Sequence, residues 1–333
     1  MSKKRALITG IAGQDGSFLS ELLLNKGYEV HGIAQKEEYE HPEKYFWRLK
    51  DILSNLIIHP TGLKDYRDTL GLLNELKPDE CYHLAAQSFV SYSIEDEFKT
   101  LDSNINGTLQ ILSALREKSP GTRLYFAGSS EMYGKTPVHP QNEETPFVPR
   151  SPYGISKIAG YHLTRNYREV YGMFACIGVL FNHESSRRDP QFVTRKITYT
   201  AAKIKSGLEK ELVLGNLDSR RDWGYAGDYV EAMYLMLQQD LPDDYVIASG
   251  QTHSVREFAD TAFGYLGLDY KQYVRVDKKL FRPEGDNLLQ GDASKAKKKL
   301  GWKPRVQFKQ LIENMVKSDL ENIKKQTESG VTR

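Results

Sequence analysis

The sequence predicts an α/β protein with a doubly wound parallel sheet followed by a smaller C-terminal lobe. Up to residue 181, short apolar runs alternate with segments of helical periodicity. This alternation is typical of right-handed βαβ units, in which helices cover both faces of a parallel sheet. A glycine-rich turn stands between the first apolar run and the first helical segment. From Asn182 onward Lys, Arg, Gly and Pro interrupt the apolar stretches, and we expect there a smaller lobe that caps the carboxyl edge of the sheet.

The expected elements follow one another at short intervals. We expect strands at 5–9, 28–34, 56–59, 81–85, 123–127 and 174–181, and helices at 17–26, 68–76, 104–118 and 153–171. Runs such as LYFA and CYHLA are nearly continuous in apolar residues, which indicates strands buried on both faces. The first domain is expected to span residues 1–181, and the second mainly residues 182–333. Residues 222–250 are expected to return to the first domain, so the boundary is discontinuous.

The composition excludes several classes of protein. The 333 residues carry 46 Lys and Arg against 44 Asp and Glu, a net charge of +2, so no strong field would attract nucleic acid or an anionic membrane. Cys81 and Cys176 each lie inside an apolar run, which favours a reducing compartment over a disulfide scaffold and predicts no metal site. No stretch has the character of a signal peptide or a membrane span. We expect a soluble, cytoplasmic protein.

Residues 9–16, TGIAGQDG, form the glycine-rich turn. Gly10 permits a tight turn, Gly13 has no Cβ to block a pyrophosphate, and Gly16 allows the following helix to pack closely. The N-terminus of that helix would then face the anion. At the start of a βαβ unit, the spacing GxxGxxG predicts a Rossmann domain that binds a nicotinamide dinucleotide.

The end of the second strand bears on the choice between NAD and NADP. An acidic residue there holds the ribose 2′-hydroxyl of NAD, whereas a basic residue accommodates the 2′-phosphate of NADP. Here the strand is followed by Gln35, Lys36 and Glu37, and no Asp occupies its tip. Lys36 would pair with the phosphate as a point charge, which favours NADP. NAD stays open, with Lys36 as an ordinary surface lysine.

A tyrosine and a lysine four residues apart form the expected catalytic pair. Tyr153 and Lys157 share one face at the start of a helix, and the ammonium is expected to favour the phenolate, so that the phenol acts as base or acid near neutral pH. Ser129 and Glu131 follow the strand at 123–127, at the sheet edge where a nicotinamide would lie. The hydroxyl would hydrogen-bond a substrate oxygen. Glu131 would supply the additional base that a dehydration requires.

With these motifs in place, the chain resembles the extended short-chain dehydrogenases that act on nucleotide sugars, and within them the GDP-mannose 4,6-dehydratases. The resemblance runs nearly from end to end. It is carried by ALITGIAGQDG, YEVHGI, HLAAQS, SSEMYG, TPFVPRSPYGISK, LFNHESSRRDPQFVTRKI, LGNLDSRRDWGYAGDYVEAM, and FRP followed by LGWKPR. The stretches around FVTRKI and RDWG are long and specific.

The resemblance implies a lyase that converts GDP-mannose to GDP-4-keto-6-deoxymannose by moving a hydride from C4 to C6 with loss of water. Tyr153 would take the proton of the 4-hydroxyl, and Ser129, where the family has threonine, would hydrogen-bond the same oxygen. Glu131 would take the C5 proton and help to expel the 6-hydroxyl. Because the hydride returns to the substrate, the cofactor would be regenerated in each turnover and stay tightly bound.

The resemblance also implies binding residues. For the cofactor they are Gly10, Gly13, Gln14, Asp15, Gly16, Lys36, Leu84, Ala85, Ala86, Tyr153, Lys157, His183 and Arg188. For the GDP-sugar they are Ser88 near the hexose, Asn182 and Lys196 near the diphosphate, and Arg221 and Arg282 at the phosphate or guanosine end. Arg187 and Arg188 match a family loop that reaches a neighbouring subunit's cofactor phosphate, which implies a homotetramer.

Three further sites, which involve four residues, depart from the family pattern. Gln35 and Lys36 stand where the family has a pair of arginines, and Gly62 stands where it has the aspartate that meets the adenine. After Arg282, the acidic residue is Glu284, one position earlier than the family's glutamate. These departures concern the two nucleotide pockets, whereas the catalytic motif differs only by Ser129 in place of threonine.

Three alternatives stay open beside this reading. The first is the same reaction on another GDP-sugar, such as a GDP-manno-heptose. The second is a GDP-4-keto-6-deoxyhexose reductase or 4-epimerase, against which the RDWG and FVTRKI stretches argue. The third is a dinucleotide sensor without enzymatic activity, which would have no reason to keep Tyr153, Lys157 and Glu131 together.

Overall fold

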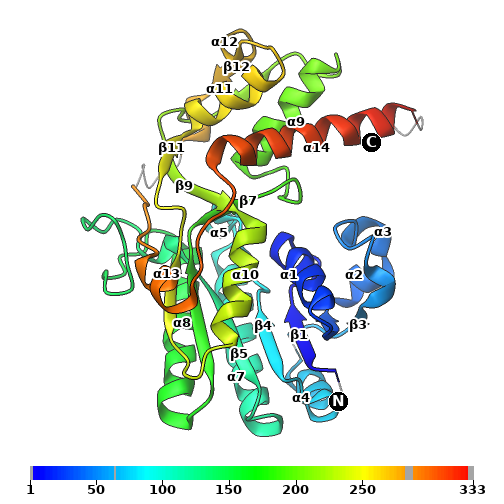
Figure 1. The fold of residues 1–333 in the computed structure, drawn as a ribbon, viewed down its shortest axis with the longest axis vertical. Coiled ribbons are helices and arrows are strands. Elements are labelled where there is room, and N and C mark those ends of the chain that lie inside the picture. The colour runs from blue at the N-terminus through cyan, green and yellow to red at the C-terminus, as the bar shows by residue number, and fades with distance from the viewer. Residues whose placement is uncertain (1–2, 64, 282–287, 329–333) are drawn as a thin grey trace.

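A seven-stranded parallel sheet lies at the centre of the computed structural model, which describes residues 3–63, 65–281 and 288–328 (Figure 1). The strands run in the order β10-β6-β5-β4-β1-β2-β3. Each pair of adjacent strands in this sheet is parallel. Their bounds are β1 (Arg5–Thr9), β2 (Glu29–Ile33), β3 (Ile57–His59), β4 (Glu80–His83), β5 (Arg123–Ser129), β6 (Ala175–Leu180) and β10 (Asp244–Ile247). The predicted fold class is confirmed.

Helices cover both faces of the sheet, as the continuous apolar strands require. They are α1 (Gln14–Asn25) and α10 (Ala226–Leu237) on one face, and α4 (Tyr66–Leu76), α7 (Gly107–Lys118) and α8 (Pro152–Tyr171) on the other. Within β1, Ala6 and Ile8 pack into the core beneath α1, while Leu7 packs into the opposite core. This alternation follows from the period of two along a strand. Both faces of β1 are therefore buried.

The second lobe lies beyond the carboxyl ends of the strands, at the top of Figure 1. It contains β7 (Asn182–Glu184), α9 (Val193–Lys205), β8 (Leu212–Leu214), β9 (Arg220–Tyr225), β11 (Thr252–Ser254), α11 (Val255–Tyr265), α12 (Tyr270–Tyr273), β12 (Val274–Val276) and α14 (Phe308–Glu328). α9, α11 and α14 pack together around Trp223, Phe258 and Ile312. Between β9 and β11 the chain returns to the sheet as α10 and β10, and β10 pairs with β6.

Short elements that the sequence pattern did not predict lie in the connections. They are α2 (Lys36–Glu40), α3 (Pro42–Tyr45), η1 (Leu53–Asn55), α5 (Val90–Glu95), α6 (Glu97–Leu101), the π-helical turn η2 (Asp102–Asn106), η3 (Ser130–Met132) and η4 (Lys278–Leu280). The basic run at 295–299 predicts a helix before Gly301, and the structure has α13 (Ser294–Leu300) there. The helix expected at 104–118 begins only at Gly107, because the π-helical turn precedes it. The strand expected at 81–85 ends at His83, because the main-chain nitrogen of Ala85 donates to Thr9 Oγ1 at 3.1 Å.

A buried carboxylate fastens the second lobe to the segments around it. Asp222 accepts hydrogen bonds from the main-chain nitrogens of Ser249 at 2.8 Å, Gly250 at 2.9 Å and Gly291 at 3.2 Å. The Ser249 hydroxyl donates a further bond at 2.5 Å. Burial raises the pKa of Asp222, although these hydrogen bonds oppose the rise. One side chain thus holds β9 against two separate loops.

We expect Asp222→Asn to lower the free energy of unfolding by about 2–4 kcal/mol, because the amide retains one acceptor oxygen and turns its NH₂ group toward main-chain donors. Urea denaturation followed by circular dichroism would measure the change. Asp218→Asn is a suitable control, since the Asp218 carboxylate is 75% exposed in its ion pair with Arg256. Its effect should stay below roughly 0.5 kcal/mol. Equal midpoints for the two variants would contradict the role given to Asp222.

Candidate active site

A cleft of about 1510 Å³ runs along the carboxyl edge of the sheet. The strand order reverses between β1 and β4, and doubly wound folds bind ligands in the crevice at such a point. The cleft brings together seventeen of the predicted site residues, which come from segments far apart in the sequence. These are Gly10, Gly13, Gln14, Asp15, Gly16, Lys36, Leu84, Ala85, Ala86, Ser88, Ser129, Glu131, Tyr153, Lys157, Asn182, His183 and Arg188.

The glycine turn shapes the part of the cleft between β1 and α1. Gly10 has a φ of +72°, and a Cβ there would lie 2.9 Å from the main chain of Ala85. A Cβ on Gly16 would lie 2.4 Å from the carbonyl oxygen of Gly10. Only glycine fits these two positions. The turn presents the start of α1, which has no side-chain cap, to the cleft, and N–H groups at such a position bind phosphate.

α8 carries Tyr153 and Lys157 into the cleft. Its start is fixed by Ser151, whose hydroxyl accepts a hydrogen bond from the main-chain nitrogen of Gly154 at 3.1 Å. Lys157 Nζ donates to the carbonyl oxygen of Ala127 in β5 at 2.9 Å and lies 5.8 Å from the centre of the Tyr153 ring. Both side chains are buried. The pair therefore stands beside the end of β5, where the sequence predicted it.

Burial governs the protonation of this pair. It raises the pKa of the Tyr153 phenol to about 12, while a hydrogen bond with Ser129 lowers it in part. It lowers the pKa of Lys157 to about 8, while the Asp15 carboxylate raises it in part. The expectation that Lys157 brings the phenol pKa toward neutrality is wrong for the protein alone. The Lys157 ammonium donates to the Ala127 carbonyl, and the loss of hydration around the phenol is the largest influence on the pKa of Tyr153.

The 3₁₀ turn η3 places Ser129 and Glu131 beside the phenol. Ser129 ends β5, and its Oγ accepts a hydrogen bond from the main-chain nitrogen of Glu131 at 3.2 Å. η3 packs closely on α8, since a Cβ on Gly154 would lie 2.7 Å from the carbonyl oxygen of Glu131. After burial, the Glu131 carboxylate adds to the rise in the pKa of Tyr153. A hydroxyl, a carboxylate and a phenol thus share one wall, an arrangement that can take up and return protons.

Several residues that line the cleft are marked by no sequence motif, and two of them hold its walls together through hydrogen bonds. Asn104 lies in the π-helical turn, where Nδ2 donates to Ser156 Oγ at 2.9 Å and Oδ1 accepts from the main-chain nitrogen of Gln87 at 2.8 Å. It thereby joins α8 to the loop after β4, and π-helical turns often mark functional sites. Arg48 lies beside the glycine turn, with Nη1 3.2 Å from the carbonyl oxygen of Ala12. No sequence motif marks either residue, and only the tertiary fold brings them to the cleft.

Asp15 and His183 form a buried pair beside the glycine turn. His183 Nε2 lies 2.8 Å from Asp15 Oδ2, and its Nδ1 lies 2.8 Å from the carbonyl oxygen of Phe181. Burial raises the pKa of Asp15, but the charge of His183 and the hydrogen bond with it bring that pKa below its ordinary value. Burial lowers the pKa of His183, but Asp15 brings it above its ordinary value. Each group therefore favours the charged form of the other.

We expect this pair to make stability depend on pH above the ordinary histidine pKa of 6.5. Because the folded pKa of His183 is raised, its contribution is fully present below 6.5 and is lost as pH rises through the folded pKa. The unfolding free energy of the wild type minus that of His183→Gln should therefore fall with rising pH. His253→Gln is the control, since burial lowers the pKa of His253 and the same difference should rise. A constant difference for His183→Gln would contradict the prediction.

The predicted substrate residues separate into two groups. Ser88 and Asn182 line the cleft, whereas Lys196 and Arg221 are not among the described residues that line it. Lys196 Nζ donates to a main-chain carbonyl of β8 at 2.7 Å, and Arg221 Nη1 donates to the preceding carbonyl group at 2.7 Å. Arg282 lies outside the described residues. The cleft therefore brings together Ser88, which is predicted near the hexose, and Asn182, which is predicted near the diphosphate.

The loop at 185–189 contacts its own chain. Arg187 forms an ion pair with Glu21 and donates to Ser17 Oγ at 3.2 Å, so it is held against α1. Arg188 lines the cleft, with its guanidinium 3.6 Å from the centre of the Phe192 ring. The reach of this loop to a neighbouring subunit stays a prediction.

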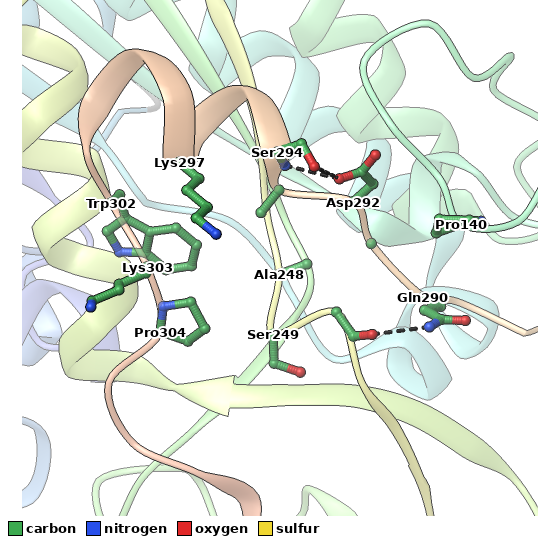
Figure 2. A pocket seen from close by; sticks show the side chains of 13 residues that line it. Pro140, Ala248, Ser249, Gln290, Asp292, Ser294, Lys297, Trp302, Lys303 and Pro304 are labelled. Atoms are coloured by element: carbon green, nitrogen blue, oxygen red, sulfur yellow. Dashed lines mark hydrogen bonds between the residues drawn. The ribbon is translucent and has the colours of Figure 1, made fainter.

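A smaller pocket of about 400 Å³ lies between α13 and the loop after β10 (Figure 2). Trp302, Lys297 and Lys303 line it. Asp292 at its rim accepts a hydrogen bond from the main-chain nitrogen of Ser294 at 2.9 Å. The predicted site residues that the structure describes all lie outside this pocket, so the larger cleft is the candidate active site.

Comparison with known proteins identifies the family. Residues 7–315 match the family model described as GDP-mannose 4,6 dehydratase. The chain belongs to this family. It is similar to "GDP-mannose 4,6 dehydratase 2" of Arabidopsis thaliana, with 51% identity over 332 residues that cover 97% of this chain and 89% of that protein. The resemblance to the GDP-mannose 4,6-dehydratases found in the sequence motifs is confirmed.

Solved structures share the fold of this dehydratase-family chain. UDP-glucose 4-epimerase of Thermus thermophilus in complex with NAD is similar, with a TM-score of 0.82, 27% identity, and coverage of 95% of this chain and 98% of that one. RMD from Pseudomonas aeruginosa complexed with NADPH has a TM-score of 0.78 and 23% identity, and the match covers 96% of this chain and 100% of that one. Among the described residues, no helix has both the length and the apolar character that crossing a membrane requires.

Proposed function

We propose that this chain converts GDP-mannose to GDP-4-keto-6-deoxymannose as a nucleotide-sugar 4,6-dehydratase, a lyase. The observation that carries the proposal is the wall of the cleft on which Ser129, Glu131, Tyr153 and Lys157 stand together. A ketone reductase needs hydride transfer and one acid–base group, whereas the loss of water also needs a base for a carbon-bound proton. Glu131 provides that base in a chain of the dehydratase family.

The residues of the cleft fit a nicotinamide dinucleotide. The absence of a Cβ at Gly10 and Gly16 and the uncapped start of α1 form a cradle for a pyrophosphate. Relatives of the same fold were solved with NAD or with NADPH. We propose tightly bound NADP as the cofactor, which supplies the group that accepts a hydride and returns it.

Each residue of the catalytic wall has a proposed proton-transfer role. Tyr153 Oη takes the proton of the sugar 4-hydroxyl, and Ser129 Oγ hydrogen-bonds the same oxygen. Lys157, held by a main-chain carbonyl in β5, favours the phenolate form of Tyr153, the form that can accept this proton. The Glu131 carboxylate takes the C5 proton and passes it to the departing 6-hydroxyl, which leaves as water. When the hydride returns to C6, C5 regains a proton from solvent through Glu131, and Tyr153 releases to solvent the proton that it took from the 4-hydroxyl. Ser88 binds the hexose of the substrate, and Asn182 binds its diphosphate.

The proposal extends to the organisation of the chain. Residues 1–181 with about 222–250 form the dinucleotide-binding domain, and the remaining residues of 182–333 form the GDP-sugar lobe. The placement of β10 at the edge of the sheet supports this division. We also propose a homotetramer, to be measured by size-exclusion chromatography with light scattering.

The test of the proposed function is turnover without added cofactor. Purified protein would be incubated with GDP-mannose alone, and the 4-keto product would be followed by NMR. Product formation without net consumption of reductant supports the dehydratase. Strict dependence on added NADPH would instead indicate the reductase or 4-epimerase. A panel of GDP-, UDP-, CDP- and dTDP-sugars that includes a GDP-manno-heptose would identify the base and the sugar, and turnover of the heptose alone would replace the hexose assignment.

A further inference from the structure

The segment between β2 and β3 places a guanidinium against the glycine turn. The side chain of Arg48 is 12% exposed and lines the cleft. Its Nη1 donates to the carbonyl oxygen of Ala12 at 3.2 Å, and its Nε donates to the carbonyl oxygen of Arg187 at 2.6 Å. The guanidinium also lies 4.2 Å from the centre of the Trp47 ring. Two hydrogen bonds and a stacked ring therefore fix this charge in the wall of the cleft.

Lys36, the cation that the sequence singled out, is placed differently. Its side chain is 81% exposed, and Nζ lies 3.8 Å from a carboxylate oxygen of Glu40, one turn further along α2. At the start of α2 the main-chain nitrogen of Gln35 already donates to the Glu38 carboxylate at 2.7 Å. An exposed, ion-paired lysine on a flexible stem contributes little to binding. The edge of the cleft formed by α2 therefore presents no fixed cation.

The charge of Arg48 is only weakly compensated. Its carboxylate partner is Asp189, whose Oδ2 lies 3.9 Å from Nη2 and whose side chain is 45% exposed. Burial lowers the pKa of Arg48 to about 10, and Asp189 opposes that change. The group thus stays protonated at neutral pH, in surroundings that favour an additional negative charge. A phosphate oxygen beside the guanidinium would supply that charge through charge-assisted hydrogen bonds.

The position of Arg48 indicates which phosphate that would be. Arg48 bonds to the glycine turn after β1, and Gln35 and Lys36 at the end of β2 line the same cleft. In dinucleotide-binding sheets these two segments flank the adenosine ribose, and an arginine nearby accommodates a 2′-phosphate. We infer that Arg48, and not Lys36, is the residue that selects the 2′-phosphate of NADP over the 2′-hydroxyl of NAD. This inference rests on the proposed dinucleotide-dependent function.

Binding of two adenosine nucleotides tests the inference without any catalytic turnover. The full-length protein, stripped of tightly bound nucleotide with activated charcoal, would be titrated calorimetrically with adenosine 2′,5′-bisphosphate and with AMP. The wild type should bind the bisphosphate more tightly. Arg48→Gln should weaken the bisphosphate roughly 10- to 100-fold and AMP less than about threefold, because hydrogen bonds to a charged phosphate are lost. Arg48→Lys should retain part of the preference, and Lys36→Gln should change either affinity less than about twofold.

Arg123→Gln is the matched control. Arg123 is also partly buried, with Nη1 donating to the carbonyl oxygens of Leu237 and Gln239 and the guanidinium 4.3 Å from the Phe174 ring. It lies at the start of β5, at the opposite edge of the sheet from the cleft, so neither nucleotide should bind differently. Thermal unfolding of every variant would be recorded, so that a loss of nucleotide binding can be distinguished from a loss of stability.

Four results would overturn the inference. Equal losses of both nucleotides in Arg48→Gln would assign Arg48 to holding the glycine turn. A selective loss of the bisphosphate in Lys36→Gln would assign the phosphate to Lys36. Equal affinities of the wild type for the two nucleotides would show that the protein does not distinguish the 2′-phosphate from a 2′-hydroxyl. If the wild type binds neither nucleotide and also fails to bind NADP, the dinucleotide site and the proposed function fail together.

Discussion

Glu131→Gln is expected to lower the rate of dehydration by roughly 10²- to 10⁴-fold, the usual contribution of a positioned general acid–base group. The substitution preserves the size of the side chain and the main-chain bond to Ser129, so the wall of the cleft should keep its shape. An amide cannot take the C5 proton. Oxidation at C4 does not require Glu131, so addition of GDP-mannose should still produce the near-ultraviolet absorbance of a reduced nicotinamide. Rapid mixing of the purified variant with substrate would measure both steps.

The control for this variant is Glu117→Gln at the end of α7, where the carboxylate is 47% exposed and paired with Lys118. Its turnover should stay within about twofold of the wild type, since surface changes of this kind have small effects. The cofactor content of both purified variants should equal that of the wild type. Wild-type turnover by Glu131→Gln would remove Glu131 from the mechanism.

Tyr153→Phe is expected to reduce turnover to a similar extent, roughly 10²- to 10⁴-fold, but at an earlier step. Without the phenol oxygen the 4-hydroxyl keeps its proton, so C4 is not oxidised and no reduced nicotinamide should form when GDP-mannose is added. The two variants therefore differ in a spectroscopic signal as well as in rate. The same rapid-mixing measurement distinguishes them.

Tyr161→Phe, on the same helix, provides the matched control. The Tyr161 hydroxyl donates to Asp244 Oδ2 at 3.1 Å, and Tyr161 is not among the described residues that line the cleft. Its loss should leave the near-ultraviolet signal unchanged. If Tyr153→Phe gave the same signal as the wild type, the proton of the 4-hydroxyl would have to be taken by another group.

The fold could be predicted because its signals are local. The strand LYFA and its neighbours carry apolar residues on both faces, and the structure buries Leu124 and Phe126 as fully as Tyr125 between them. The glycine turn is equally local, since Gly10 and Gly16 meet backbone atoms where a side chain would not fit. Among the segments that the sequence pattern did not predict is the one between β2 and β3. Its short helices have no apolar period long enough to predict.

The catalytic wall could be predicted for the same reason, and the cofactor's adenosine side could not. Tyr153 and Lys157 are one helical turn apart, so their proximity follows from helix geometry alone. Arg48 reaches the glycine turn only because the chain after β2 folds back over it, and this depends on packing around Phe46 and Leu49. Lys36 is near the strand tip in sequence, but α2 begins at that residue and directs its side chain to Glu40 and solvent.

The return of the chain to the sheet as β10 has a consequence for folding during synthesis. β6 has the sequence ACIGVL and is buried along its whole length, with β5 on one side and β10 on the other. Until residues 244–247 leave the ribosome, β6 is an open apolar edge that can pair with another chain. During that interval the ribosome synthesises β7, α9, β8 and β9 of the second lobe, and then α10. The nascent protein is thus most prone to aggregation after β6 has formed and before β10 closes the sheet.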